Sequence, residues 1–297
     1  MNYYKILNEE ETHHGLKYHD GLIEDPLEFN PSGDCEPGGI YFSREDILAF
    51  LWCGPWIRQV TLPEGESIYK NPGSPKKWKA KRVILGPRRK IDLEVIKDLV
   101  EEGADIHVSN DYALRWATAN GHLEIVKYLV EKGSDIHTNN DEAFILSVEG
   151  GFLDIVKYLT EQNIDLDVHG HYAVVVAAEN GYLDIVKYLE EKGANIRTCN
   201  NEALKWAAYN GYLEVVKYLV EKGADIHAKD DYALRKAAEN GHLEVVEYLV
   251  EKGADIQADN NYALRRSAKE GHLEVVEFLK SCINCKGEIN ELLQDFE

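Results

Sequence analysis

The sequence has few cysteines, and their arrangement does not suit disulfide bonds. The five cysteines are odd in number and scattered along 297 residues: Cys35, Cys53, Cys199, Cys282 and Cys285. Disulfide-built secreted proteins use even, closely spaced sets, so we exclude that class. Cys282 and Cys285 form a CxxC pair, but the sequence has no second pair or nearby histidine to complete a zinc site. We therefore predict no bound metal or cofactor and interpret the cysteines as free thiols.

Long apolar runs are also missing. No stretch approaches the roughly 18 apolar residues that a membrane-spanning helix needs. The chain starts with MNYYKILNEEE, which is acidic, whereas a secretion signal starts with basic and then apolar residues. We therefore expect a cytoplasmic protein that makes no contact with membranes.

Positive charge is scarce, and the shortage is uneven along the chain. The formal net charge is −20. Residues 1–90 hold 13 acidic and 13 basic side chains, so the remainder holds 40 acidic and 20 basic ones. An acidic surface repels the phosphates of nucleic acids and attracts basic proteins. The charge distribution thus argues against nucleic acid as a partner of residues 91–297 and favours a protein with a basic surface.

The first ninety residues differ in composition from the rest of the chain. Prolines and glycines recur there and separate short apolar runs typical of β-strands. These runs are residues 39–43, 56–62 and 78–85. The segment SREDILAFLW predicts one helix, with Ser43 as its N-cap. We predict a small α+β domain over residues 1–90, in which the helix covers one face and antiparallel strands around Val60 and Val83 are neighbours.

After residue 90 the sequence repeats every thirty residues. Glycine recurs at one position of each block, and leucine recurs two positions later. The glycines are Gly121, Gly151, Gly181, Gly211, Gly241 and Gly271, and the leucines are Leu123, Leu153, Leu183, Leu213, Leu243 and Leu273. Such a fixed period indicates a solenoid of stacked repeats. The repeats are expected to span 91–285, with a half unit at 91–110, whole units starting at 111, 141, 171, 201, 231 and 261, and a capping helix at 286–297.

Each unit is expected to contain two helices. In the block from 231, Asp231 is suited to cap a helix that starts at Tyr232, and Gly241 is suited to end it. A second apolar stripe starts near His242, and a short polar turn then leads to the next unit. One pair of helices cannot bury both of its apolar faces, so neighbouring units must cover each other and the ends need caps. We expect the domain at 1–90 to cap the first repeat.

The wording of the repeat resembles a known family. The segment GHLEVVEYLVEKGADI is similar, nearly residue for residue, to the core of the ankyrin repeat, and the likeness extends from Ile91 to about Lys280. The usual unit has about 33 residues and opens with TPLH, whereas YALR stands there in this chain and about three residues of the hairpin tip are missing. Units shortened in this way resemble the ankyrin proteins of giant DNA viruses. The resemblance implies a mainly α-helical ankyrin-repeat solenoid that binds proteins and is not an enzyme.

The resemblance also implies where a partner binds. In ankyrin proteins the variable, solvent-facing positions lie on the concave face, at the outer side of the first helix and at the loop tips. The matching positions are Ala119, Glu149, Glu179, Tyr209, Glu239 and Lys269 on the helices, and Asn110, Asn140, His169, Asn200, Asp230 and Asn260 at the tips. Glu149 and Glu179 beside Tyr209 suit a basic protein partner, with the tyrosine as an aromatic anchor. We expect a monomer that binds another protein, one of the host cell if the chain is viral.

Two further columns of the repeat have a functional and a structural interpretation. The fifth and sixth positions of two successive blocks are apolar, Ile145-Leu146 and Val175-Val176, and are flanked by Trp116 and Trp206. This set is either a patch for a partner or packing between repeats, and we favour packing. Histidines recur at the start of the second helix, at His122, His242 and His272. We interpret these histidines as structural rather than metal-binding.

Two alternative functions concern the first ninety residues. His14-Gly15 and the later GIYFS strand resemble the pattern of ADP-ribosyltransferases, in which Glu64 or Glu66 would polarise the nicotinamide ribose. The structural interpretation is that the glycines form turns at strand ends. Nine Lys or Arg residues between 70 and 90, with a tryptophan among them, would suit RNA. They would equally balance acidic groups within the molecule.

Overall fold

The computed structural model describes residues 2–31, 36–166, 168–194 and 198–285, without the side chains of residues 198–200, 284 and 285. The chain divides into two compact units, Met1–Leu146 and Ser147–Glu297, and each is described by itself. The capping helix expected at 286–297 lies outside the described residues. Within the described part, no helix combines the length and the apolar character needed to cross a membrane.

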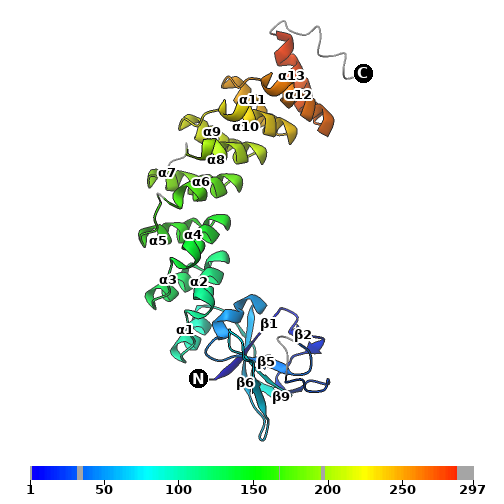
Figure 1. Cartoon of the computed structure of the whole chain (residues 1–297), viewed down its shortest axis with the longest axis vertical. Helices are drawn as coiled ribbons and strands as arrows, with labels where there is room; N and C mark the ends of the chain where they lie inside the picture. Colours follow the sequence, from blue (N-terminus) through cyan, green and yellow to red (C-terminus); the bar gives the residue numbers. More distant parts are fainter. Residues whose placement is uncertain (1, 32–35, 167, 195–197, 286–297) are drawn as a thin grey trace. The chain divides into compact units, whose positions relative to one another are not determined.

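The first unit opens with short antiparallel strands (Figure 1). They are β1 (Tyr3–Leu7), β2 (Thr12–His13), β3 (Leu16–Lys17), β4 (Gly21–Glu24), β5 (Ile40–Phe42), β6 (Trp56–Thr61), β7 (Ile68–Lys70), β8 (Trp78–Ala80), β9 (Arg82–Leu85) and β10 (Arg89–Lys90). The main sheet has the order β1–β6–β9–β4, and β10 also pairs with β6. A second sheet has the order β5–β8–β7, while β2 and β3 form a hairpin of their own.

A single apolar core joins the two larger sheets. It contains Leu7, Tyr18, Ile23, Ile40, Phe42, Val60, Trp78, Ala80, Val83 and Leu85. Because side chains alternate across a strand, Val83 and Leu85 point into this core while Ile84 between them is exposed. The predicted pairing of the strands around Val60 and Val83 is confirmed, since Val60 lies opposite Leu85. The run at 78–85 forms two strands, β8 and β9, that belong to different sheets.

The helix expected from SREDILAFLW differs from the prediction. It is a short 3-10 helix, η1 (Ile47–Cys53), and it begins later than the sequence suggested. Ser43 does not cap it, because the backbone N–H and C=O of Ser43 are hydrogen-bonded to those of Tyr4, both at 2.8 Å. Strand pairing therefore removes Ser43 from the helix, and the apolar side of η1 packs against β1 and the first repeats.

Pairs of α-helices follow from residue 93 onward (Figure 1). The first are α1 (Leu93–Glu101), α2 (Val108–Ala119), α3 (Leu123–Glu131) and α4 (Thr138–Glu149), and the boundary between the compact units falls inside α4. The second unit continues with α5 (Leu153–Glu161), α6 (Gly170–Glu179), α7 (Leu183–Glu191), α8 (Thr198–Tyr209), α9 (Leu213–Glu221), α10 (Ala228–Glu239), α11 (Leu243–Glu251), α12 (Ala258–Glu270) and α13 (Leu273–Cys285). In α11 the buried residues Val245, Val246 and Leu249 form the apolar stripe that the sequence predicts.

Several contacts within the first unit join residues 1–90 to the first repeat. The amide N–H of Asp105 donates to the C=O of Glu45 at 2.7 Å, next to η1, and η1 itself packs against α2. The hydroxyl of Tyr4 on β1 donates to the carboxylate of Glu102 at 2.8 Å. As a result, η1 covers a side of α2 that would otherwise be exposed.

The glycine that ends the first helix meets two requirements in the units from 141, 171, 201 and 231. Gly241 has a φ of +76°, which other residues rarely adopt. It also faces the ring of His272 in the next repeat, so an added Cβ would lie 2.5 Å from Nδ1 of that ring. The ring is held in place because His272 Nε2 donates a 3.0 Å hydrogen bond to the C=O of Glu239. Gly211 has the same relation to His242, so these histidines have a structural role.

Gly241→Ala is expected to destabilise the chain by two separable effects. The left-handed backbone costs alanine about 1–2 kcal/mol, and displacing the His272 ring adds about 1–3 kcal/mol. Gly271→Ala is the matched control, because its φ is +81° and no described atom lies within 4 Å of the added Cβ. Urea unfolding followed by circular dichroism should show the larger loss for Gly241→Ala. Equal losses would mean that the ring contact between repeats contributes nothing.

Candidate protein-binding surface

Several loop tips between repeats are single left-handed turns, whereas His169 at the tip before α6 has a φ of −101°. Ser109, Asn110 and Asp111 all have φ between 54° and 58°. The same conformation recurs at residues 229–231 and 259–261. Asn and Asp tolerate this region better than other residues with side chains, because their short polar groups bond nearby backbone. The tips are therefore compact, as the missing residues of the shortened repeat predict.

An arginine of the following helix closes these turns. Arg235 donates from Nε to the C=O of Asp230 and from Nη2 to the C=O of Lys229, each at 2.8 Å. Arg115 and Arg265 hold their own turns through the same two donors. The planar guanidinium presents both donors in a fixed fork, which a lysine cannot do. The arginine of YALR thus has a structural role in the shortened repeat.

In several units the Asp or Asn before the first helix is hydrogen-bonded to the turn that follows the second helix and leads to the next unit, which the sequence interpretation missed. Asp231 was predicted to cap a helix starting at Tyr232. Residues 229–231 are non-helical, so the regular turns of α10 do begin at Tyr232, but Asp231 has a φ of 54° and is 5% exposed, and its carboxylate bonds other groups. Its Oδ1 accepts hydrogen bonds from the amide N–H of Asp255 at 2.9 Å and from Nδ1 of His227 at 3.0 Å. Asp111 binds the amide of Asp135 in the same way, and Asn201 binds that of Asp225.

The twelve positions predicted to meet a partner lie on first helices and at tips in both units. Asn110, Ala119, Asn140, Glu149, Tyr209, Asp230, Asn260 and Lys269 are exposed, and His169, Glu179 and Glu239 are half-buried. The side chain of Asn200 lies outside the described residues. That these positions bind a partner stays a prediction.

The carboxylate of Glu239 is occupied by contacts within the molecule. It accepts hydrogen bonds from Lys236 Nζ at 2.6 Å, from Arg266 Nε at 3.0 Å and from the Tyr262 hydroxyl at 3.1 Å. Burial alone would raise the pKa of Glu239, but these donors outweigh it and lower that pKa to about 2. A partner would have to displace two cations to reach this carboxylate.

Glu179 occupies the same column but has different neighbours. Val176 precedes it by one turn and Trp206 is contributed by the next repeat, at the two positions where Glu239 has its cations. Among the described residues, the carboxylates of Glu179 and Glu149 form no ion pair. These two acidic groups are therefore the ones in this column that remain able to meet a basic partner.

Tyr172 on α6 is exposed and was not singled out from the sequence. It is 57% exposed, whereas Tyr232, at the same position of a later repeat, is half-buried. The guanidinium carbon of Arg235 lies 5.4 Å from the centre of the Tyr232 ring. Val175 takes the place of that arginine on α6, so no cation of the same helix covers Tyr172. The sequence feature that indicates the exposure of Tyr172 is Val175, which stands at a repeat position where most other units have Arg or Lys.

Apolar residues that are exposed (Val168, Tyr172, Tyr209) or half-buried (Val175, Trp206) gather on α6, on the tip before it and on the adjacent α8. We call this set the α6–α8 patch: Val168, Tyr172, Val175, Trp206 and Tyr209. The helices α6 and α8 pack against each other, and the rings of Trp206 and Tyr209 meet edge to face with centres 5.5 Å apart. Val176, by contrast, is only 5% exposed, so the packing interpretation holds for that residue. Exposed aromatic side chains on a rigid helical face are typical of protein-binding surfaces.

The motif that resembles ADP-ribosyltransferases has structural roles in the first unit. His14 and Gly15 form the two-residue turn of the β2–β3 hairpin, with φ values of 49° and 79°. The carboxylate of Glu66 accepts hydrogen bonds from the backbone N–H groups of Lys81 and Arg82 and from Arg82 Nε, at 2.9–3.1 Å. The strand-turn interpretation therefore accounts for His14-Gly15, and Glu66 serves the sheet.

Several basic residues between 70 and 90 are engaged inside the molecule. Lys79 is fully buried and donates to the C=O of Glu36 at 3.1 Å. Arg82 pairs with Glu66 at 2.9 Å, and Arg89 pairs with Asp98 at 2.7 Å. These three residues thus have roles within the molecule. In the part of the chain that the structure describes, no three His, Cys, Asp or Glu side chains are grouped to hold a metal ion.

Paired helices stacked at a fixed period, joined by short tips, define the class of helical repeat proteins. A family model described as ankyrin repeats (3 copies) matches residues 88–170, 166–230 and 229–291. The chain belongs to the ankyrin-repeat family. Ankyrin repeats bind other proteins, as the sequence resemblance implied.

Several relatives among known proteins belong to Acanthamoeba polyphaga mimivirus. Two ankyrin repeat proteins are 42% and 33% identical over 118 and 127 residues, covering 37% and 41% of this chain. This chain spans 38% and 62% of their lengths. An uncharacterised protein of the same virus is 39% identical over 126 residues, which are 41% of this chain and 91% of that protein. The predicted resemblance to ankyrin proteins of giant viruses is confirmed.

A solved structure supports the fold. The crystal structure of the human ASB11 ankyrin repeat domain is similar with a TM-score of 0.52 and 23% identity. The likeness covers 57% of this chain and 82% of that domain. At this identity the likeness concerns the fold alone.

Glu239 predicts a pH dependence of stability. In the unfolded chain this carboxyl protonates near 4.5, and in the folded chain only near 2, so folding favours its ionised form. Its contribution is present above pH 4.5 and is lost as the pH falls toward 2. The difference in free energy of unfolding between wild type and Glu239→Gln should therefore shrink between about pH 5 and pH 3. A difference that does not change with pH in urea titrations would contradict the ion cluster.

Proposed function

We propose that this chain is a non-enzymatic scaffold that binds a protein through the first-helix face and tips of its ankyrin repeats. The observation that carries the proposal is the α6–α8 patch. Tyr172 is 57% exposed and Val168 is 62% exposed, although the fold does not need either side chain at the surface. Exposed aromatic and aliphatic groups beside acidic ones form the kind of patch on which binding energy concentrates.

The partner has a basic surface. Glu149 and Glu179 lie in the second unit with the patch and form no ion pair among the described residues. The surface charge of residues 91–297 is also strongly acidic, which steers a basic protein toward it. Glu239 contributes less, because Lys236 and Arg266 already neutralise it.

The domain at residues 1–90 acts as the cap of the first repeat. The packing of η1 on α2 and the hydrogen bond from Asp105 to Glu45 support this role. An uncovered end repeat would expose an apolar helix face. The relatives are viral, so we further propose that the chain acts as a monomer on a protein of the infected host, in the host cytoplasm.

Affinity capture from Acanthamoeba lysate, followed by binding measurements with the captured protein, tests this proposal. Tyr172→Ala should weaken binding by about tenfold or more, since truncating an anchor residue of an interface costs at least ~1.4 kcal/mol. Glu179→Lys should weaken the binding of a basic partner more at low salt than at high salt, because salt screens the attraction between surface charges.

Leu273→Ala is the control for this experiment. Leu273 is 71% exposed on α13, away from the α6–α8 patch in the sequence of repeats, and its loss should leave binding unchanged. A partner whose affinity is the same for wild type, Tyr172→Ala and Glu179→Lys would show that the face is not the binding surface.

A further inference from the structure

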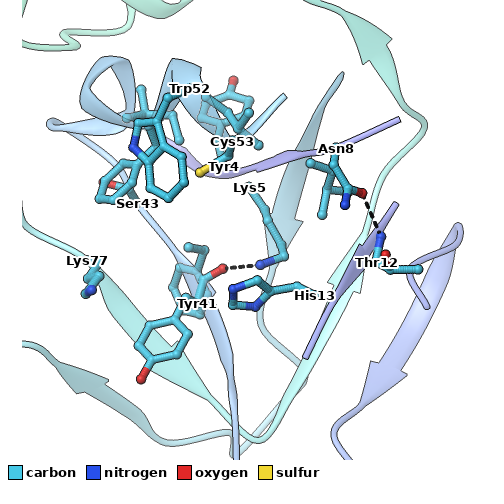
Figure 2. A pocket seen from close by; sticks show the side chains of 15 residues that line it. Tyr4, Lys5, Asn8, Thr12, His13, Tyr41, Ser43, Trp52, Cys53 and Lys77 are labelled. Atoms are coloured by element: carbon cyan, nitrogen blue, oxygen red, sulfur yellow. Dashed lines mark hydrogen bonds between the residues drawn. The ribbon is translucent and has the colours of Figure 1, made fainter. Parts of the chain in front are cut away.

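A pocket in the first unit has no part in the function proposed above. Its volume is about 290 Å³, and it is lined by residues of β1, β2, β5 and η1 together with Lys77 (Figure 2). Pockets for drug-sized ligands range from about 300 to 1,000 Å³. This pocket therefore suits a compound with one ring system rather than a dinucleotide.

The lining of the pocket is basic, although the protein is acidic. Lys5, His13 and Lys77 contribute to it, and none of its lining residues is Asp or Glu. Lys5 is only 6% exposed, and its Nζ donates a 3.0 Å hydrogen bond to the C=O of Tyr41. An ammonium group in such a low-dielectric position attracts an anion more strongly than one on the open surface.

The state of His13 agrees with a positive local potential. Burial, and then the positive charges of Lys5, His14 and Lys77, lower the pKa of His13 to about 4. His13 is therefore neutral at pH 7, and its ring is able to donate one hydrogen bond and accept another. A negative charge entering the pocket would relieve the repulsion that depresses this pKa.

The opposite side of the pocket is aromatic. Figure 2 shows the Trp52 indole across the pocket from the Lys5 ammonium and the His13 ring. Trp52 is 66% exposed, while Phe42 and Ile47 of the pocket wall are 3% and 1% exposed. A tryptophan left largely in water beside an apolar wall offers a flat surface on which a ligand ring can stack. The pocket thus joins a cationic side to an aromatic side.

We propose that this pocket binds a small anionic ligand that carries a flat ring. The negative group lies beside Lys5 and Lys77, and the ring lies against Trp52. Asn8 Oδ1 accepts a 2.9 Å hydrogen bond from the amide of Thr12, which leaves the Asn8 amide nitrogen to donate to the ligand. A phosphate, as in a mononucleotide, and a carboxylate both fit this description.

Titration calorimetry on the full chain distinguishes the two kinds of anion. The probes are AMP for a ring with a phosphate and indole-3-acetate for a ring with a carboxylate. Adenosine and indole-3-ethanol are their uncharged counterparts. At least one anionic probe should bind about tenfold or more tightly than its counterpart, and the probe that does so identifies the anionic group.

Substitutions then locate the binding. Lys77→Gln and Trp52→Ala should each weaken the successful probe by about tenfold, because one removes the cation and the other the stacking surface. Lys76→Gln is the matched control: its side chain is exposed and does not line the pocket. In a histidine NMR titration, the bound probe should raise the pKa of His13 from about 4.

Three results would overturn the proposal. One is that neither anionic probe binds at concentrations up to about 10 mM. Another is that adenosine or indole-3-ethanol binds as tightly as its anionic counterpart. The third is that Lys77→Gln and Trp52→Ala leave the affinity unchanged, or that Lys76→Gln weakens it as much. Protein binding by the repeats is tested by a separate experiment, so failure of one proposal does not contradict the other.

Discussion

The ring that a repeat places on the glycine of the repeat before it is the contact on which the stack depends. At Gly241 this ring is His272, held by a hydrogen bond to the C=O of Glu239. On the tip side, Asp231 accepts a hydrogen bond from the amide of Asp255, which lies in the turn leading to the next repeat. The contact at Gly241 needs a residue without a Cβ atom, and the contact at Asp231 needs a short side chain that accepts a hydrogen bond. The thirty-residue period places these two kinds of residue at fixed positions. These ties hold neighbouring repeats of the second unit together.

The period of the sequence was sufficient to predict the helix pairs. The glycine and leucine columns fixed the length of each unit, and the Asn and Asp residues at the tips marked its turns. Asp231 shows where such reasoning ends, because a short acceptor suits both a helix cap and a hydrogen bond to a more distant turn. Ser43 failed for a similar reason: its pairing with Tyr4, 39 positions earlier in the chain, overrides its local preference for an N-cap.

The candidate site was predictable in part. Helical spacing placed Glu179 and Glu239 in one column, yet one carboxylate is available and the other is neutralised by Arg266 of the next repeat. The exposure of Tyr172 could be recognised only once its neighbours were known, because the cations that cover the equivalent Tyr232 come from other positions in the sequence. The pocket between Lys5 and Trp52 is built from segments far apart in the sequence, and no local pattern indicates it.

Native-state hydrogen exchange of wild type and Asp231→Ala tests the coupling between repeats most directly. The substitution removes the acceptor of the Asp255 amide, which lies in the turn between α11 and α12 that leads to the following unit. If each unit is held by its neighbour, the amides of α10 and α11 and those of α12 and α13 should all exchange faster. Faster exchange confined to residues 228–231, with α12 and α13 unchanged, would contradict a stack held together by contacts between successive units.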